Sequence, residues 1–350
     1  MDLRTTRWKI GFMLLAFVLA MAGFATAAWF YRSSRIPQAA QLPTKPTPVR
    51  PIAAIAVAAR PNTPSSAPTP QEWSPPANPT AARPRFQVSV DPMQEFNDDL
   101  KTDLVRELTP SFPELSAYLS VDPEKGADPA YKNFTFQLLD AASKAQDNDR
   151  PAMLLAADLL ASKIWCGDEN KDQCEQVRRE FKQRNLSFEH EELGGGFYYS
   201  RDLLWRIWRD YPGSDAGEHA FVLLLDLGWD TSGVCAKGGD QFREVIHQGE
   251  SFLTNRPTSP NRAVVTLLVG EAYAAWWALS NESSGEMADY VDPKQYQQGA
   301  DEARLKAIQY FDLVLQMAPN SKLTEFAVQT LPPLRLEQVP EQYKFFCVYD

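Results

Sequence analysis

The feature that most constrains this chain is an unbroken run of uncharged residues near its start. Residues 10–31 are IGFMLLAFVLAMAGFATAAWFY and include no charged side chain. As an α-helix at ~1.5 Å per residue the run spans roughly 33 Å, enough to cross a hydrocarbon core of about 30 Å. Trp8, Trp29 and Tyr31 lie at its two ends, where interfacial aromatic residues are common. The run predicts a transmembrane signal anchor.

A cleaved signal peptide is the competing interpretation. Residues 25–27 are ATA, a small-residue cleavage pattern, although the apolar run continues past them and is long for a signal peptide. With residues 1–9 as a short cytoplasmic tail, an anchor gives a single-pass inner-membrane protein, and cleavage releases it into the periplasm. Arg32 and Arg35 follow the run, so the positive-inside rule does not fix the orientation. A body that faces the cytoplasm stays an alternative.

Residues 32–90 predict a disordered, proline-rich linker. Positions 37–84 hold 13 of the 27 prolines, and each proline removes a backbone donor and fixes φ. As polyproline chain at ~3.1 Å per residue, this stretch could reach up to roughly 150 Å. Residues 1–85 carry a net charge of +8 and the whole chain −10, which leaves −18 for residues 86–350. Such an acidic body repels phosphate backbones, so we expect no nucleic-acid partner.

Residues 91–350 predict an all-α domain of stacked helical pairs. Apolar residues recur at helical spacing, and strand-like alternation is nearly absent before the C-terminal YKFFCVYD. We expect Pro332-Pro333 to end the last helix and Gly194-Gly195-Gly196 to be a flexible linker between two helices. The expected helices lie near 94–108, 129–146, 150–165, 170–185, 197–211, 216–228, 239–255, 261–280, 300–318 and 322–331.

Two segments have the spacing of a tetratricopeptide repeat. Residues 307–319, AIQYFDLVLQMAP, have the small, aromatic, apolar and proline positions of its second helix, and an earlier segment has the L-G-x-x-Y pattern of its first. Residues 281–299 would then be an insertion between the two helices. The matching residues are Val269, Gly270 and Tyr273 in the first helix and Ala307, Phe311, Val314 and Pro319 in the second.

Three junctions of the form Pro-x-Ser precede expected helices, at 212–214, 257–259 and 319–321. Serine can cap the helix that follows. The gaps of about 45 and 62 residues between these junctions exceed the ~34-residue repeat, so the array is expected to be degenerate.

The chain resembles the tetratricopeptide-like (TPR) helical repeat proteins of the bacterial cell envelope. Tyr211–Ala220 carries the YP-x-S…A junction found in outer-membrane assembly lipoproteins and in periplasmic coordinators of envelope constriction. The resemblance covers about residues 195–335 and implies a scaffold without a cofactor that binds a protein or peptide of the envelope. The 281–299 insertion, the GWDTSGVCAKGGD loop and the missing lipid-attachment cysteine depart from it and leave the particular complex open.

The four cysteines predict two disulfides in an oxidising compartment, since no pair has C-x-x-C spacing. Cys166 and Cys174 flank a short turn between expected helices, and a disulfide would close it. Cys235 and Cys347 pair by elimination. The apolar tail around Cys347 is expected to dock on the body and close the end of the array.

The same turn has a calcium-like pattern. Asp168, Asn170 and Asp172 have the 1-3-5 spacing of an EF-hand loop, but Gln173 replaces the glycine and Arg179 the final glutamate. We interpret it as a solvated acidic turn and predict no metal site, while calcium binding stays open.

No catalytic motif is present, and we expect no enzymatic activity. His190, His219 and His247 lack metal-ligand spacing, and Cys235 with one of them is the remaining way to build a nucleophile. A helical envelope enzyme or a metal-dependent binding domain is therefore the alternative to a scaffold.

Four tryptophans lie on two expected helices: Trp205, Trp208, Trp276 and Trp277. Core packing explains them most simply. An aromatic groove for a peptide partner is the second interpretation.

Overall fold

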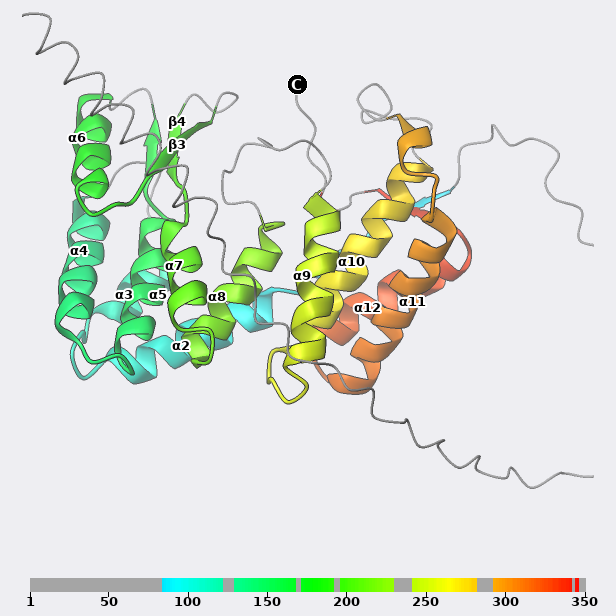
Figure 1. Ribbon diagram of the computed structural model, residues 1–350, viewed down its shortest axis with the longest axis horizontal. Coiled ribbons are helices and arrows are strands. Elements are labelled where there is room, and N and C mark those ends of the chain that lie inside the picture. Colours follow the sequence, from blue (N-terminus) through cyan, green and yellow to red (C-terminus); the bar gives the residue numbers. More distant parts are fainter. Residues whose placement is uncertain are drawn as a thin grey trace, which may run out of the picture. The chain divides into compact units, whose positions relative to one another are not determined.

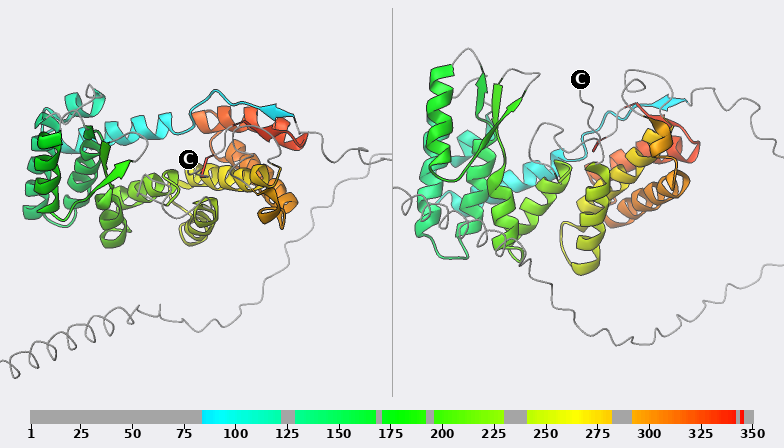
Figure 2. Two further views of the ribbon diagram at one scale, coloured as in Figure 1. Left: turned by 90° about the horizontal axis from the view of Figure 1, so that it is seen from above. Right: turned by 45° about the horizontal axis from the view of Figure 1, so that its top comes forward.

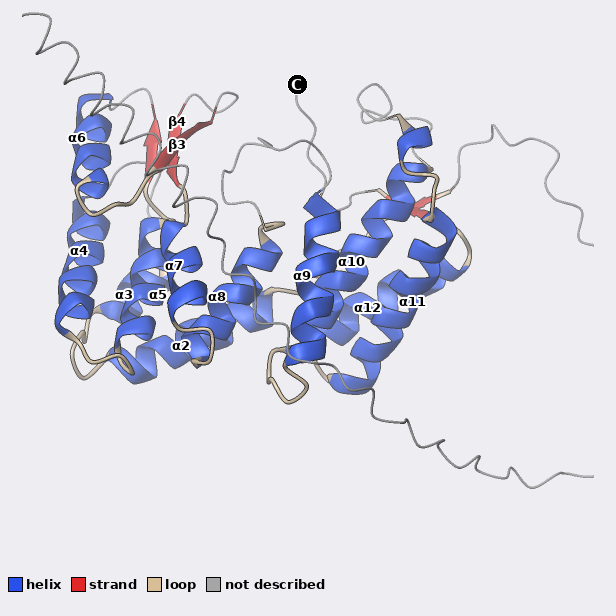
Figure 3. Cartoon of the chain, viewed as in Figure 1, coloured by secondary structure: helices blue, strands red, loops and turns tan. Residues whose placement is uncertain are grey.

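The computed structural model describes residues 84–121, 129–167, 171–191, 196–229, 241–281, 292–341 and 344–345. The predicted anchor at 10–31, and the proline-rich linker before residue 84, lie outside this range. The described residues form a helix-rich body with little strand, as Figures 1 and 3 show. This agrees with the predicted helical class.

Eleven α-helices make up the described part of the body. Ten lie where apolar spacing predicts a helix, and α3 is an additional one. The helices are α2 (Gln94–Leu108), α3 (Leu115–Ser120), α4 (Pro129–Lys144), α5 (Arg150–Ala161), α6 (Lys171–Lys182), α7 (Asp202–Asp210), α8 (Asp215–Asp226), α9 (Gln241–Asn255), α10 (Arg262–Ser280), α11 (Ala300–Met317) and α12 (Lys322–Arg335), with a 3-10 turn, η2, at Pro293–Gln295.

Two small sheets depart from the all-helical expectation. Strands β2 (Trp165–Gly167), β3 (Phe188–Glu191) and β4 (Gly196–Tyr199) form an antiparallel sheet in the order β2-β4-β3. Strands β1 (Arg85–Phe86) and β5 (Val339–Pro340) form a two-stranded parallel pair. The second pair joins the two ends of the described body.

The prediction of one helix at 197–211 and a glycine linker before it is wrong. Gly196 begins β4, and α7 starts only at Asp202. Aromatic residues favour strand when they find cross-strand neighbours, and here Phe188 lies opposite Tyr199. Gly196 is needed because an added Cβ would lie 2.5 Å from the ring of Trp165.

The prediction that Pro332-Pro333 ends the last helix is also wrong, because α12 continues to Arg335 with both prolines inside it. The missing N–H groups fall near the end of the helix. The Leu336 N–H donates to the Pro332 and Pro333 carbonyls at 3.1 and 3.0 Å. Leu334 is fully buried, so core packing offsets the lost hydrogen bonds.

Two of the three Pro-x-Ser junctions cap helices as predicted. Ser214 accepts from the Gly217 N–H at 3.0 Å at the start of α8, and Ser321 accepts from the Thr324 N–H at 3.3 Å at the start of α12. Ser259 does not cap α10. It donates to Glu218 of α8 and so ties the loop before α10 to a neighbouring helix.

Helices pack mainly on their neighbours in sequence: α4 on α5, α7 on α8, and α9 to α12 each on the next (Figure 1). Two hydrophobic clusters result, one around α5 and α7 and one around α10 and α11. Helix α8 serves both, since Leu224 packs in the first and Leu225 in the second. Among the described helices, α10 alone is long and apolar enough to cross a bilayer, and 83% of its window is buried inside the body.

Residues 84–93, which we term the N-terminal strap, run along α12 before α2 begins (Figure 2). The Ser89 N–H donates to Gln329 of α12 at 3.3 Å. The Val339 N–H donates to the Pro84 carbonyl at 2.9 Å, and the Glu341 N–H to the Phe86 carbonyl at 2.7 Å. The strap therefore begins against the C-terminal helices, and α2, which follows it, packs on the N-terminal helices α3 and α5. Apolar spacing does not predict this path of the chain.

Candidate functional site

Helix α2 carries a row of carboxylates along one face. Glu95, Asp99, Asp103 and Glu107 recur every fourth residue, and residues four apart lie above one another on a helix. The adjacent face buries Leu100, Leu104 and Leu108. An acidic row therefore borders an apolar one along the whole helix.

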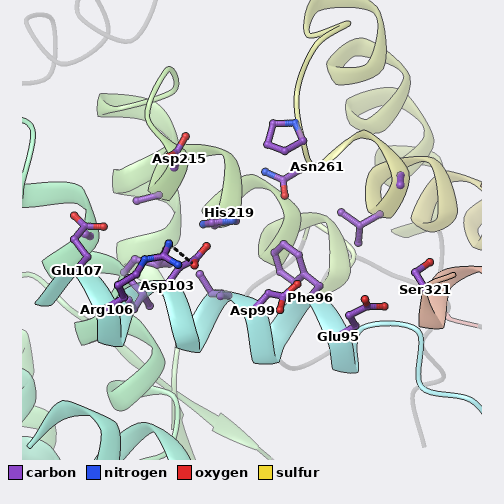
Figure 4. A pocket seen from close by; sticks show the side chains of 18 of the residues that line it. Glu95, Phe96, Asp99, Asp103, Arg106, Glu107, Asp215, His219, Asn261 and Ser321 are labelled. Carbon is purple, nitrogen blue, oxygen red and sulfur yellow. Dashed lines mark hydrogen bonds and ion pairs between the residues drawn. The ribbon is translucent and has the colours of Figure 1, made fainter. Parts of the chain in front are cut away.

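This face of α2 forms one wall of a groove of about 690 Å³. The opposite side comes from the first residues of α8, α10 and α12, and the floor from α5. Figure 4 shows Asp215, His219 and Asn261 across the groove from the acidic residues of α2. The apolar lining is Phe96, Leu100, Leu104, Ala152, Leu155, Ala216, Ala263, Val264 and Leu323.

The groove has an excess of negative charge. Five carboxylates line it, and Arg106 is its one basic residue among the described lining. Arg106 pairs with Asp103 at 2.6 Å on the exposed side of α2 (Figure 4). Asp99 and Glu107 make no hydrogen bond or ion pair within the described part of the chain. They are free to meet a cation.

Two ionisable groups in the groove are shifted toward neutrality. Burial, followed by repulsion from Asp149, Asp215 and Asp103, raises the pKa of Glu107. Burial lowers the pKa of His219, against the pull of nearby carboxylates. The His219 ring packs edge-on against Phe96 at 5.7 Å, so it is part of the apolar floor.

The wall opposite α2 is held in place by polar contacts. Arg256 donates to Glu218 of α8 at 2.8 Å, and Asn261 donates to the same carboxylate at 3.4 Å. At the other end, Glu95 accepts from the Lys322 N–H at 2.8 Å, which satisfies a free donor at the start of α12. Glu95 therefore supports the groove, while Asp99 and Glu107 further along α2 make no hydrogen bond or ion pair with the described residues.

The groove suits recognition of a cation with an apolar face. Its wall supplies charge and its floor supplies apolar area. Across the described residues, no group of three His, Cys, Asp or Glu side chains is placed to hold a metal ion. The acidic row is visible in the sequence as a period of four, but the facing helix starts are not.

The predicted repeat-packing residues meet between α10 and α11. Phe311 and Val314 are fully buried, and an added Cβ on Gly270 would lie 3.2 Å from the Phe311 ring and 3.2 Å from Tyr310 Cβ. Glycine thus allows the close approach of these helices. Val269, Tyr273 and Ala307 are buried in the same cluster, and Pro319 is exposed just beyond α11.

The predicted disulfide residues are only partly described. Cys166 on β2 and Cys174 on α6 are both buried and are free thiols in this structure. Burial, and next the neighbouring Cys174 thiol, raise the pKa of Cys166. Cys235 and Cys347 lie outside the described residues. Of the apolar tail around Cys347, the structure describes Phe345, which is buried and whose carbonyl accepts from the Phe242 N–H at 3.1 Å.

The acidic turn is also only partly described. Asp168 and Asn170 lie outside the described residues, so the geometry of a calcium loop is not defined. Asp172 is in the first turn of α6.

The three histidines are on separate elements and do not form one site. His190 on β3 packs on Phe197 at 4.9 Å, His219 lies in the groove, and His247 is on α9. A nucleophile pair with Cys235 lies outside the described residues.

The four tryptophans do not form a single groove. Trp205 packs on Trp229 at 5.0 Å and Trp208 on Phe221 at 4.8 Å, both from α7. On α10, Trp277 is buried and Trp276 stacks on Tyr273. Most of their area serves the two hydrophobic clusters, which is the simpler of the two interpretations.

Sequence reasoning missed two buried carboxyl groups. Asp158 of α5 is fully buried and pairs with Arg201 at 2.7 Å. Glu271 is a single acid in the middle of the apolar helix α10, and that isolation is the signal that marks it.

A comparison with protein families, curated proteins and solved structures found no match to this chain.

Proposed function

We propose that this protein is a membrane-anchored, TPR-like scaffold of the cell envelope whose acidic groove binds a basic amphipathic segment of another protein. Residues 10–31 anchor it, the proline-rich linker spaces the body from the membrane, and the body faces the periplasm. The observation that carries the binding role is the groove of about 690 Å³, with a carboxylate row above an apolar floor.

The chemistry of the groove selects the partner. A helix or extended peptide with Lys or Arg on one side and Leu or Val on the other would place its charges against Asp99 and Asp103 and its apolar face against Leu104 and Val264. An acidic or fully polar segment would leave the floor solvated or repel the wall. Complementary charge also speeds association, and salt weakens it.

The TPR-like architecture is supported by the packing of α10 on α11. The small residue Gly270 lies where the two helices approach, and the helix stop at Pro319 follows α11. These are the positions that the repeat pattern assigns to close packing and termination.

The binding role is tested with the full-length protein in lipid nanodiscs. The probe is a Leu–Lys amphipathic peptide, compared with its Leu–Glu counterpart. We expect the Lys peptide alone to bind, and Asp99→Asn with Asp103→Asn to weaken it about tenfold, or ~1.4 kcal/mol. Removing two charges elsewhere, by Asp301→Asn with Glu302→Gln at the start of α11, is the matched control. Equal binding by the groove variant and the control would refute the groove.

The anchor and orientation need a separate test. Carbonate-washed membranes should retain the protein, and protease added to intact spheroplasts should digest the body. A soluble form whose N-terminus is Ala28 would replace the anchor with a cleaved signal. Protection of the body from protease would place the scaffold in the cytoplasm.

A further inference from the structure

A second cavity lies in the C-terminal half, away from the acidic groove. This chamber has a volume of about 320 Å³, opens to solvent, and is lined by the N-terminal strap, α10, α11, α12, β5 and Lys344. Both ends of the described body thus contribute to its walls. The aromatic lining is Phe86, Phe311 and Phe326.

One carboxyl group contributes to the lining of this chamber. Glu271 of α10 lines it, and its Oε2 is buried and makes no hydrogen bond with the described residues. Buried polar atoms are almost always hydrogen-bonded, and an unpaired one costs folding free energy. The other polar side chains of the lining are Gln87, Lys344 and Thr330. The Thr330 hydroxyl already donates to the Phe326 carbonyl at 2.9 Å.

The nearby cation serves two acids, since the charges of Glu271 and Asp226 both raise the pKa of Lys344 against its burial. Lys344 lines the same chamber, but its ammonium donates to Asp226 of α8. At Glu271 the Lys344 charge favours the ionised form, and repulsion from Asp226 and Asp91 opposes it. Chiefly through burial, the pKa of Glu271 is raised to about 7. The group that would complete this cluster is a hydrogen-bond donor with positive charge.

We propose that the chamber is a binding site for a small primary ammonium compound with an apolar or aromatic body. The ammonium would pair with the Glu271 carboxylate, and the body would pack between Phe86, Phe311 and Phe326. Aromatic faces also attract a cation, which adds to the preference. The volume is at the lower end of the range for small-molecule sites, so a ligand of about ten non-hydrogen atoms is the expected size.

The proposal is tested with benzylammonium as the probe, and with benzyl alcohol and benzoate as ligands of the same shape. Titration calorimetry uses full-length protein in nanodiscs at pH 8, with empty nanodiscs as the blank. We expect one benzylammonium to bind per chain. Benzyl alcohol should bind with at least tenfold lower affinity, and benzoate should show no binding. Equal affinity for the alcohol, or no benzylammonium binding at millimolar concentration, would overturn the proposal.

Two variants separate the chamber from general effects on folding. Glu271→Gln keeps the shape and removes the charge, and should weaken benzylammonium at least tenfold. Ala274→Leu fills the chamber beside an intact Glu271 and should also abolish binding. Glu325→Gln, on the exposed side of α12, is the control and should bind as the parent does. Unchanged affinity in either chamber variant, with the parent's thermal unfolding retained, would show that the probe binds elsewhere.

Discussion

Among the described residues, each half of the helical body has a carboxyl group with a buried oxygen atom, Asp158 and Glu271. The two groups differ in whether a basic side chain donates a hydrogen bond to them. In the N-terminal half, Asp158 Oδ2 accepts from Arg201 Nε at 2.8 Å, so its charge is paired, although its Oδ1 makes no hydrogen bond with the described residues. In the C-terminal half, Glu271 borders a chamber, and its Oε2 makes no hydrogen bond with any residue that the structure describes. A paired charge holds two elements in one geometry. A buried carboxyl oxygen without a hydrogen bond lowers the free energy of unfolding, and a bound cation would restore part of that loss.

The setting of each group explains this difference. Arg201 lies just before α7 with a φ of 56°, a left-handed conformation that costs energy for a non-glycine residue. It reaches across to α5 and so fixes the turn between β4 and α7. Glu271 faces the strap and the C-terminal segment, which add aromatic side chains and a lysine that is already engaged.

The largest effect is expected from breaking the paired charge. Asp158→Ala leaves Arg201 half-enclosed without its partner, which should lower the free energy of unfolding by about 3–5 kcal/mol. Urea unfolding followed by tryptophan fluorescence measures it. Asp140→Ala removes an exposed pair with Arg184 and should cost less than ~1 kcal/mol. A similar loss in both variants would contradict the assigned role of Asp158.

The unpaired carboxyl should give the opposite sign and a pH dependence. The pKa of Glu271 is raised to about 7 in the folded state from an ordinary 4.5, so between these values the folded state holds a proton that the unfolded state has lost. Stability should therefore be full below pH ~4.5 and fall as pH rises to about 7, by somewhat over ~3 kcal/mol in all. Glu271→Gln should be more stable than the parent at pH 8 and should lack this slope.

Unfolding titrations at pH 5 and pH 8 check this expectation. The parent and Glu271→Gln are compared at both pH values, and Glu325→Gln should behave as the parent does. If the free energy of unfolding changed equally between pH 5 and pH 8 in the parent and in Glu271→Gln, the titrating group would be a residue other than Glu271. A ligand in the chamber would reduce the slope of the parent, because it supplies the missing partner.

The predicted Cys166–Cys174 disulfide in the N-terminal half should raise the free energy of unfolding by a smaller amount. Closing this short loop should raise it by roughly 2–3 kcal/mol in the loop-entropy model. Because the raised pKa of Cys166 leaves little thiolate, the folded protein should oxidise slowly, and the bond should form before α6 docks. Non-reducing peptide mapping after thiol blocking shows whether it and the predicted Cys235–Cys347 bond exist. Four free thiols would place the body in the cytoplasm.

The smallest effect on stability is expected in the acidic groove. Asp99 lies between other acids on an exposed face, so Asp99→Asn should change the free energy of unfolding by less than ~0.5 kcal/mol, toward greater stability. The same urea titration measures it. A loss above ~1 kcal/mol would mean that the acidic row has a structural role instead of a binding one.

Local sequence was enough to place most helices and two of their caps. The period of apolar residues places α2 at 94–108 and α10 at 262–280 within about one residue, because each helix buries one stripe or its whole surface. Ser214 and Ser321 cap the next helix through atoms three residues away. Such contacts depend only on neighbours in the chain.

The candidate sites could be predicted only in part. The acidic row of α2 and the lone acid in α10 are plain in the sequence, since both follow from residue type and spacing. The groove and the chamber are not, because their other walls come from helices and chain ends that are far from them in the sequence. Sequence period carries no information about which distant segment covers a given face.

Local pattern alone was sufficient for the helical class of the body and the bounds of its longest helices. Only the tertiary structure decided that 196–199 is a strand, that α12 runs through two prolines, and that the strap joins both ends of the described body. In each of these cases a distant partner outweighs local preference. Cross-strand aromatic residues, a buried leucine and backbone hydrogen bonds to the last strand each stabilise more than the local signal opposes.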